Sequence, residues 1–439
     1  MMKIYRFLLC CCVGFGVNIL SAQNPIIRNQ FSADPTARVF NGKVYLYPSH
    51  DIPSPADKNL RKDWFCMEDY HVFSSENLTD WTDHGVIVTQ TKVPWLTRQN
   101  YDMWAPDCVF KNGKYYFYFP VGGKIGIAIA DEPEGPYTVQ DKPVIGTGGI
   151  DPCVLIDKDG QAYIFTARGR ISVAKLKDNM VEVDGQAQTI TNLPPKGLIE
   201  GPFAFQFQGK YYLTYPHVEN KIERLEYAMS DSPMGPYKQV GVIMDESPTG
   251  CWTNHQSIVQ FNNQWYLFYH SNDYSPRFDK NRSVRIDSLF FNSDGTMQKV
   301  KPTFRGVGLT SASKEIQIDR YSRLSDKGVS IALNDTVNTF AGWKTLFKEP
   351  NSWVQYNSVD FGRKKFKKVE VKAQSVSGGS VQIRLDKIDG QVVTEISIPK
   401  GNNWKTLEAM VSKASKGTHT LFIVLKDTPV EIDWIRFKN

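Results

Sequence analysis

Residues capable of acid–base or ligand chemistry stand at the start of five similar stretches of the chain. Each stretch continues with a short apolar run, a tight turn and a second run rich in Tyr, Phe and Trp. The five leading residues recur every 44 to 73 positions and are Asp34, Asp107, Asp151, Glu200 and His255. Two carboxyl groups on either side of a sugar can hydrolyse a glycosidic bond, because one protonates the leaving oxygen and the other activates water. A third carboxyl group near the acid raises the pKa of that acid by charge repulsion.

The elements that must position these residues are predicted to be β-hairpins. The turns carry Asn-Gly, Asp-Gly and Gly-Lys pairs, which are typical hairpin signals. A third strand-like run follows each hairpin, as in "IGIAIAD" and "LEYAMSD". Recurring units of this kind predict the blades of a five-bladed β-propeller, with a generic β-sandwich as the alternative. In a propeller the innermost strands surround one axis, so the leading residues would converge on one polar pocket.

Composition narrows the class of protein. The chain has 439 residues, which is enough for two domains, and 13% of them are aromatic. Its net charge of +6 is small and no long Lys/Arg run occurs, so nucleic-acid binding is not predicted. No Cys/His spacing typical of zinc and no GxSxG motif is present, so neither a zinc site nor a nucleophilic serine is predicted.

Residues 1–22 are predicted to form a secretory signal peptide. Lys3 and Arg6 precede the apolar stretch "FLLCCCVGFGVNIL", and the small residues Ser21 and Ala22 follow it. At 14 residues this stretch is too short to span a bilayer comfortably. We therefore expect a mature protein that is secreted or periplasmic and has no membrane span. Four cysteines would remain, and a chain of this size does not need them as disulfides.

Five motifs, in this order, resemble glycoside hydrolase family 43: "SADPTARVF", "MWAPDCVFKNGKYYFYF", "GGIDPCVLIDKDG", "LIEGPFAF" and "TNHQSIV". The resemblance covers about residues 24–305 and implies a five-bladed propeller that cleaves glycosidic bonds with inversion. By motif, it implies that Asp34 is the general base, Glu200 the general acid, and Asp151 the residue that tunes the pKa of the acid and orients it. The alternative interpretation of these residues is structural. Asp34 and Asp151 would then be turn caps before a strand, and Glu200 a surface residue beside a Gly-Pro turn. Asp107 matches a position that is usually structural.

The same resemblance suggests further groups around the carboxyl groups. His255 matches a histidine near a calcium ion or a water cluster on the propeller axis, and a hydrogen-bonded core histidine is the alternative. Trp104 and Phe31 are candidates for the apolar wall of the sugar site, unless they belong to the core. Of the two arginines in "NRSVRIDSLFF", Arg285 is the expected pocket residue, where it would balance the carboxylate charge and bind a sugar hydroxyl.

A second β domain is expected from about residue 315 to residue 439. Its short runs alternate apolar and polar residues, which predicts a jelly-roll-like β-sandwich. The motifs "WVQY", "NNWKTLEAMVS" and "EIDWIRF" resemble carbohydrate-binding module family 6. That resemblance implies a cleft in which two aromatic rings sandwich a sugar. Trp404 matches one ring, and Trp343 or Phe347 is expected to supply the other.

Two more features of this domain follow from the same resemblance. Asp319 and Asp433 match positions that hold a structural calcium ion. Glu431 stands where sugar-binding members often carry Asn, so a sandwich that only supports the propeller is the alternative.

The sequence thus predicts an all-β protein with a signal peptide (1–22), a propeller (24–305) and a β-sandwich (315–439). By resemblance, it would be an inverting hydrolase of plant cell-wall polysaccharide that needs no cofactor for its chemistry. The first expectation is an α-L-arabinofuranosidase acting on arabinoxylan or arabinan side chains. A β-xylosidase, an endo-1,4-β-xylanase, an arabinanase and a galactan-cleaving enzyme are alternatives. A non-catalytic glycan-binding protein is the rival class, but such a protein would not need three acids in three blades.

Overall fold

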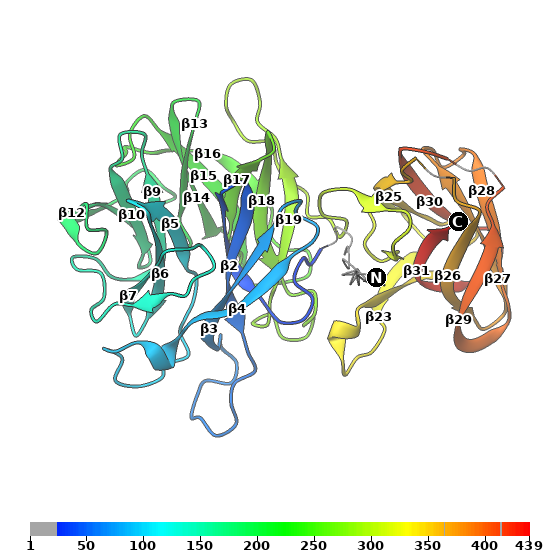
Figure 1. The fold of residues 1–439 in the computed structure, drawn as a ribbon, viewed down its shortest axis with the longest axis horizontal. Coiled ribbons are helices and arrows are strands. Elements are labelled where there is room, and N and C mark those ends of the chain that lie inside the picture. Colours follow the sequence, from blue (N-terminus) through cyan, green and yellow to red (C-terminus); the bar gives the residue numbers. More distant parts are fainter. Residues whose placement is uncertain (1–23, 364, 413–414) are drawn as a thin grey trace, which may run out of the picture.

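The computed structural model describes residues 24–363, 365–412 and 415–439 (Figure 1). The predicted signal peptide lies outside the described residues. The regular structure of the described part is almost entirely β-strand, arranged in seven sheets. None of its helices is long and apolar enough to cross a membrane. The all-β prediction is therefore confirmed.

Five antiparallel sheets follow one another along the N-terminal part of the chain. The first contains β1 (Ala33–Phe40), β2 (Lys43–Asp51), β3 (Met67–Ser75) and β4 (Thr82–Thr89). The second contains β5 (Asp107–Lys111), β6 (Lys114–Val121), β7 (Lys124–Ala130) and β8 (Thr138–Val139). The third contains β9 (Ile150–Ile156), β10 (Ala162–Ala167), β11 (Ile171–Leu176) and β12 (Val183–Thr189). The fourth contains β13 (Phe203–Phe207), β14 (Lys210–Val218), β15 (Glu223–Ser230) and β16 (Lys238–Met244). The fifth contains β17 (Ser257–Phe261), β18 (Gln264–Ser271) and β19 (Ser283–Leu289).

The first strands of the five sheets contact one another in cyclic order. β1 packs against β5, β5 against β9, β9 against β13, β13 against β17, and β17 against β1. The sheets are thus the blades of a five-bladed propeller, with these strands innermost. Each blade begins at one of the five hairpins that the sequence predicts.

Local sequence explains why the hairpins form. The turns between the first two strands of three blades contain Asn41-Gly42, Asn112-Gly113 and Asn262-Asn263, and all six residues have positive φ. Tight hairpin turns require such backbone angles, which Asn and Gly adopt most readily. These turns set the register of the strand pairs that begin the blades.

Alternation along the second strands packs the blades together. On β6, Phe117 and Phe119 join the core that the first and second blades share, whereas Tyr116 and Tyr118 join the core toward the third blade. Successive side chains of a strand point to opposite faces. Burial of each ring stabilises the fold by about 1.5–3 kcal/mol, so the Tyr- and Phe-rich runs hold the ring of blades.

The C-terminal domain is a sandwich of two sheets. One contains β20 (Thr310–Ser311), β22 (Arg323–Leu324), β25 (Trp353–Asp360), β30 (Thr418–Leu425), β27 (Gly379–Leu385) and β28 (Val392–Ile398). The other contains β21 (Ile316–Gln317), β23 (Val329–Leu333), β24 (Trp343–Phe347), β31 (Val430–Lys438), β26 (Lys368–Ser375) and β29 (Gly401–Met410). Apolar side chains from both sheets form one core between them, as expected for a β-sandwich.

The two domains are in direct contact through aromatic rings. Tyr274, in the loop between β18 and β19, stacks on Trp343 of the sandwich with ring centroids 4.8 Å apart. Phe340 lies between Tyr274 and Phe31, with centroids 5.0 and 4.9 Å away. Arg320 of the sandwich donates from Nη2 to the Tyr274 hydroxyl at 3.3 Å. Figure 1 shows the sandwich lying beside the propeller.

Four cysteines in the described part of the chain, Cys66, Cys108, Cys153 and Cys251, are buried and free. The fold therefore holds without disulfides among them, as expected for a chain with cores of this size.

Candidate active site

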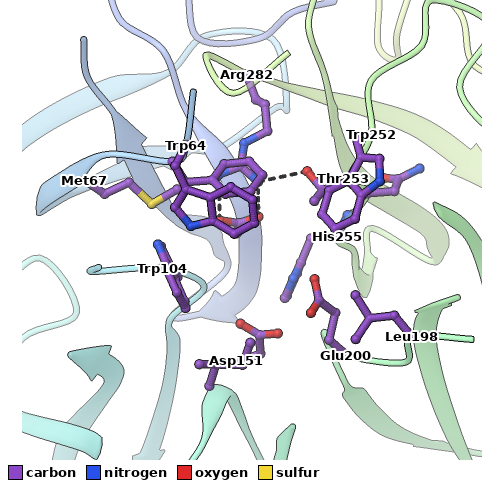
Figure 2. Close-up of a pocket in the computed structure, with 14 residues that line it drawn as sticks. Trp64, Met67, Trp104, Asp151, Leu198, Glu200, Trp252, Thr253, His255 and Arg282 are labelled. Atoms are coloured by element: carbon purple, nitrogen blue, oxygen red, sulfur yellow. Dashed lines mark hydrogen bonds and ion pairs between the residues drawn. The ribbon is translucent and has the colours of Figure 1, made fainter. Parts of the chain in front are cut away.

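A pocket with a volume of about 170 Å³ lies where the innermost strands of the propeller begin (Figure 2). It brings together five residues that the sequence singles out: Asp34, Trp104, Asp151, Glu200 and His255. The full lining is Asp34, Trp64, Phe65, Met67, Trp104, Ile150, Asp151, Leu198, Glu200, Trp252, Thr253, Asn254, His255 and Arg282. The convergence of three acids predicted from the blade repeat is therefore present.

Two of the acids have an unusual backbone conformation. Asp34 and Asp151 have φ of 46° and 53°, and each precedes a proline at an irregularity in the ladder of its blade. A non-glycine residue in this left-handed region costs on the order of 1–3 kcal/mol, and such strain concentrates at functional sites. Both side chains are buried, so the bulges aim two costly carboxyl groups at the axis.

Glu200 reaches the pocket by a slightly different route. In its blade, the residue before the proline is Gly201, with φ of 51°, so Glu200 stands one position earlier than Asp34 and Asp151 do. A Cβ atom on residue 201 would lie 2.9 Å from Nδ1 of His255. The glycine leaves room for the imidazole, and the carboxyl group comes from the neighbouring residue.

Asp34 is held by a buried arginine. Arg282 donates from Nη1 to Oδ1 of Asp34 at 2.8 Å and from Nη2 to Oδ2 at 3.2 Å. Ser49 donates to Oδ2 at 2.6 Å. Burial raises the pKa of Asp34, but Arg282, the nearby histidines and Ser49 outweigh it and bring the pKa to about 2. Asp34 is thus an ionised carboxylate at any pH at which the protein would work.

Hydrogen bonds to Asp51 and His270 fix the arginine and the strand that carries Asp34. Arg282 also donates to Asp51 from Nε and Nη2, each at 2.9 Å, and from its backbone N–H at 2.7 Å. The backbone N–H of Asp34 donates to Nδ1 of His270 at 3.0 Å. Burial, together with the charge of Arg282, lowers the pKa of His270 to about 3. His270 is therefore a neutral acceptor toward Asp34, with Nε2–H directed to the carbonyl of Thr253 at 3.1 Å.

The remaining carboxyl groups form a separate acidic cluster. Asp151 accepts the N–H of Gly201 at 2.9 Å, which ties it to the backbone that presents Glu200. Glu223, fully buried, accepts the N–H of Asn254 at 2.6 Å and influences the pKa of Glu200. Burial is the largest cause that raises the pKa of all three acids, and Glu200 adds charge repulsion to Asp151 and Glu223. The cluster therefore retains protons at pH values where Asp34 is ionised.

Aromatic side chains form the walls. Figure 2 shows Trp64 and Trp104 on one side of the carboxyl groups and Trp252 on the other. The ring of Phe65, 5.2 Å from that of Trp64, lies under the guanidinium group of Arg282 at 4.7 Å. Apolar ring faces suit the C–H faces of a sugar, while carboxyl groups address its oxygens.

His255 lines the pocket as a neutral imidazole. Burial lowers its pKa to about 4, with Asp34 opposing and Arg282 reinforcing the shift. A neutral imidazole can bind a metal or a water network. The nearby Asp34 is already engaged by Arg282, so calcium here would take one nitrogen and mainly water, which is a sparse donor set for an ion that prefers six to eight oxygens. A calcium ion at His255 stays a prediction.

Two expected pocket residues lie elsewhere. Arg285 is not in the pocket: it donates from Nε to Asp273 at 2.7 Å and its guanidinium group lies 4.4 Å from the Phe304 ring. Arg282 occupies the expected place because it precedes β19 and bonds to Asp51. Phe31 does not line the pocket either, since its ring packs on Phe340 at the domain boundary.

The expected sugar cleft of the sandwich is also not assembled as predicted. Phe347 is fully buried in the sandwich core, and Trp343 is covered by Tyr274, so neither ring is available to a sugar. Trp404 is half-buried on β29, with the ammonium groups of Lys344 and Lys372 at 6.0 and 5.8 Å from its ring.

The residues expected to bind a structural calcium ion carry their own counterions. Nε of Arg320 lies 2.8 Å from Oδ2 of Asp319, and Nζ of Lys372 lies 2.8 Å from Oδ2 of Asp433. Calcium requires a cage of oxygens without competing cations. Both carboxylate oxygens of Asp319 are nevertheless buried without a hydrogen-bond partner among the described residues, and burial, with the charge of Asp433 adding to it, raises the pKa of Asp319 to about 6. A structural calcium ion at Asp319 and Asp433 stays a prediction.

Asp107 is structural, as its motif suggests. It is fully buried, accepts Nε and Nη2 of Arg38 at 3.0 and 2.7 Å, and accepts the N–H of Val154 at 2.6 Å. This carboxylate joins the first three blades and does not line the pocket.

A propeller whose axis carries an ionised aspartate, an acidic cluster with raised pKa values and aromatic walls is the arrangement expected of a class of protein, the glycoside hydrolases. The family model described as "Glycosyl hydrolases family 43" matches residues 22–297, and that described as "Carbohydrate binding module (family 6)" matches residues 324–439. The chain belongs to glycosyl hydrolases family 43 and is an O-glycosyl hydrolase. The rival prediction of a non-catalytic binding protein is set aside.

The chain is similar to proteins named as xylosidases/arabinosidases and to proteins named as arabinoxylan arabinofuranohydrolases. A xylosidase/arabinosidase 43A of Humicola insolens is 35% identical over 63% of this chain and 99% of its own length. An arabinoxylan arabinofuranohydrolase of Bacillus subtilis (strain 168) is 28% identical over 92% of this chain and 89% of its own length. A crystal structure of an arabinoxylan arabinofuranohydrolase from Bacillus subtilis, in complex with cellotetraose, covers 96% of this chain and 99% of its own, with a TM-score of 0.58 and 25% identity. A β-xylosidase/α-arabinofuranosidase from a compost metagenome, in complex with xylotriose, covers 64% of this chain and 97% of its own, with a TM-score of 0.58 and 33% identity.

Proposed function

We propose that this protein removes single α-L-arabinofuranosyl groups from arabinoxylan, a plant cell-wall polysaccharide. The observation that carries the proposal is the pocket on the propeller axis. Its volume of about 170 Å³ is small against the roughly 300–1,000 Å³ of pockets for drug-sized ligands. A pocket of this size suits one terminal sugar ring, whereas an endo-acting enzyme needs an open cleft for several.

The electrostatics support one role for each acid. Asp34, whose pKa is about 2, would act as the general base that takes a proton from water. Glu200, in the cluster whose pKa values are raised, would act as the general acid that protonates the leaving oxygen. Asp151 would orient Glu200 through the N–H of Gly201, while burial and the charge of Asp34 raise the pKa of Glu200.

The choice of arabinofuranosyl rests on domain organisation. The Bacillus subtilis arabinoxylan arabinofuranohydrolase aligns with 92% of this chain, both domains included. A β-xylosidase is the second candidate, because relatives named xylosidase/arabinosidase and β-xylosidase are 35% and 30% identical over the part of the chain that they match. Secretion through the segment 1–22 remains part of the proposal.

The test compares kcat/KM on an aryl α-L-arabinofuranoside and an aryl β-D-xyloside, and sugar release from arabinoxylan and from linear xylo-oligosaccharides. We expect the arabinofuranoside and arabinoxylan to be preferred, Asp34→Ala to abolish both reactions, and Glu200→Ala to abolish sugar release from arabinoxylan. Preference for the xyloside with xylose release would replace the proposal with the second candidate. Release of internal oligosaccharides would contradict exo action.

Stereochemistry tests the role of Asp34 independently. If Asp34 activates water, the sugar first released has the inverted anomeric configuration. Proton NMR early in the reaction should show that anomer before mutarotation. Retention would overturn the assignment of Asp34 as the base.

A further inference from the structure

Three side chains with metal-binding chemistry lie together on the first blade, outside the pocket. They are His50 on β2 and Asp69 and His71 on β3, which are neighbouring strands (Figure 1). One ligand atom from each lies within 4.8 Å of the other two. Asp69 and His71 are two positions apart on one strand and so share a face. In the part of the chain that the structure describes, these three form the cluster with that property.

The contacts of the cluster resemble those of a metal site with its outer shell. Nδ1 of His50 lies 2.7 Å from Oδ1 of Asp69. Nδ1 of His71 lies 3.0 Å from Oδ1 of Asp83, on β4. A carboxylate that accepts Nδ1–H leaves the imidazole lone pair on Nε2 and makes that nitrogen a better ligand. Asp83 is therefore placed as the outer partner of His71.

The charge balance of the cluster differs from that of other aspartates in the propeller. Asp34 and Asp107 are paired with arginines. The ion-pair partners recorded for Asp69 and Asp83 are the histidines themselves, and an imidazole is cationic only when it is protonated. Asp69 and Asp83 thus contact side chains that can themselves ligate a divalent cation.

We propose that His50, Asp69 and His71 bind a first-row divalent metal ion, of which Zn²⁺ is the representative. Two nitrogens and one carboxylate oxygen suit zinc and its neighbours, whereas calcium and magnesium prefer oxygen. Ligand atoms around tetrahedral zinc are about 3.4 Å apart, given bonds of about 2.0–2.1 Å. The three ligand atoms here lie within 4.8 Å of one another, so small side-chain rotations would bring them to that spacing. All three side chains are between 15% and 20% exposed, which leaves the fourth position to water.

Binding would clamp the strand that supports the pocket. His50 stands between Ser49, which donates to Asp34, and Asp51, which accepts from Arg282. Alternation along β2 directs His50 away from those two side chains. The metal would therefore tie β2 to β3 on one face while the pocket uses the other.

The test measures zinc binding to the untagged full-length protein after chelator treatment, by isothermal titration calorimetry. We expect one zinc ion per chain and a rise in Tm on saturation. His50→Gln and His71→Gln should each abolish that binding, and Asp83→Asn should weaken it by about tenfold or more. Cobalt(II) absorption in the wild type should report a site with nitrogen ligands.

The matched control is His419→Gln in the sandwich. His419 lies 2.9 Å from Asp386, so this variant breaks a similar His–Asp pair that belongs to no cluster of three. It should bind zinc like the wild type. Absence of zinc binding in the wild type, or binding that survives in both folded His50→Gln and His71→Gln, would overturn the proposal and leave two ordinary His–Asp pairs. Tight binding of calcium by the same residues would also contradict it.

Discussion

Arg282 joins Asp34 to Asp51: its Nη1 lies 2.8 Å from Oδ1 of Asp34, and its Nε lies 2.9 Å from Oδ2 of Asp51. One buried cation thus serves two buried carboxylates. Removing one partner from such an arrangement leaves a charge without compensation. The ionisation of Asp34 depends on this arginine more than on any other side chain, because Arg282 is the strongest of the groups that lower its pKa.

The first prediction concerns Arg282→Lys. An ammonium group cannot contact both carboxylates with the geometry of a guanidinium group. The pKa of Asp34 should rise from about 2 by about one unit or more. Since the base acts when ionised, the acidic limb of the pH profile of kcat/KM should move to higher pH. At the optimum, kcat/KM should fall by about tenfold to a hundredfold.

Arg285→Lys is the matched control for that experiment. Arg285 is equally buried but pairs with Asp273, away from the pocket. Its variant should lose stability and keep the acidic limb in place. If the limb does not move in Arg282→Lys, the assignment of Asp34 as the ionised base is wrong.

The second prediction concerns the leaving group. Glu200→Gln cannot donate a proton, so the loss of rate should depend on how much help the leaving oxygen needs. With a natural oligosaccharide, kcat/KM should fall by about 10²–10⁴. With an aryl glycoside whose phenol is strongly acidic, the loss should be much smaller. Asp34→Asn should lose activity on both substrates alike, and an equal loss for Glu200→Gln would argue against its role as the acid.

The third prediction concerns His270 and pH. Its pKa is lowered to about 3 in the folded protein, against about 6.5 in an unfolded chain. The unfolded state therefore binds an extra proton between these values, and the stability that His270 contributes above pH 6.5 is lost as the pH falls toward 3. Between pH 6.5 and 5, the wild type should lose about 2 kcal/mol of unfolding free energy that a His270→Gln variant does not lose. Urea denaturation at both pH values measures this difference, and parallel behaviour of the two proteins would contradict it.

The fourth prediction concerns the domain boundary. Trp343→Ala removes a buried indole that stacks on Tyr274, which should cost about 3–5 kcal/mol. Scanning calorimetry should then resolve separate transitions for the propeller and the sandwich. Trp404→Ala serves as the control, because this half-buried tryptophan on β29 lies away from the boundary and should cost less. Equal losses for the two variants would show that the boundary contributes little.

Sequence patterns were sufficient for the fold and for the three main acids. Hairpin turns and aromatic runs repeat with each blade, and Asp34, Asp151 and Glu200 stand at the start of that repeat, so their convergence follows from the ring. The position of Glu200, one residue earlier than Asp34 and Asp151 relative to the proline, has a cause that sequence does not reveal. It depends on Gly201 taking the backbone conformation that the two aspartates take in their blades.

The remaining pocket residues could not be predicted for a physical reason. Trp64, Trp252 and Arg282 come from loops, whose paths are set by tertiary contacts and not by any period. Arg282 and Arg285 are both buried and both pair with aspartates, so composition does not separate them. Glu223 opens β15 in "ERLEY", and only the contact with Asn254 reveals its place beside the acidic cluster.

The stacking of Tyr274 on Trp343 has a consequence for how this enzyme can evolve or be rebuilt. Tyr274, Asp273 and Arg282 share the loop between β18 and β19, so the seam with the sandwich and the anchor of the catalytic aspartate lie on one segment. A domain joined by a flexible linker can be replaced without changing its neighbour. Here, a different C-terminal domain would have to supply an aromatic ring that stacks on Tyr274, or that tyrosine would become exposed to solvent. Exchange of the sandwich would therefore disturb the same loop that carries Arg282 and, through it, the position of Asp34.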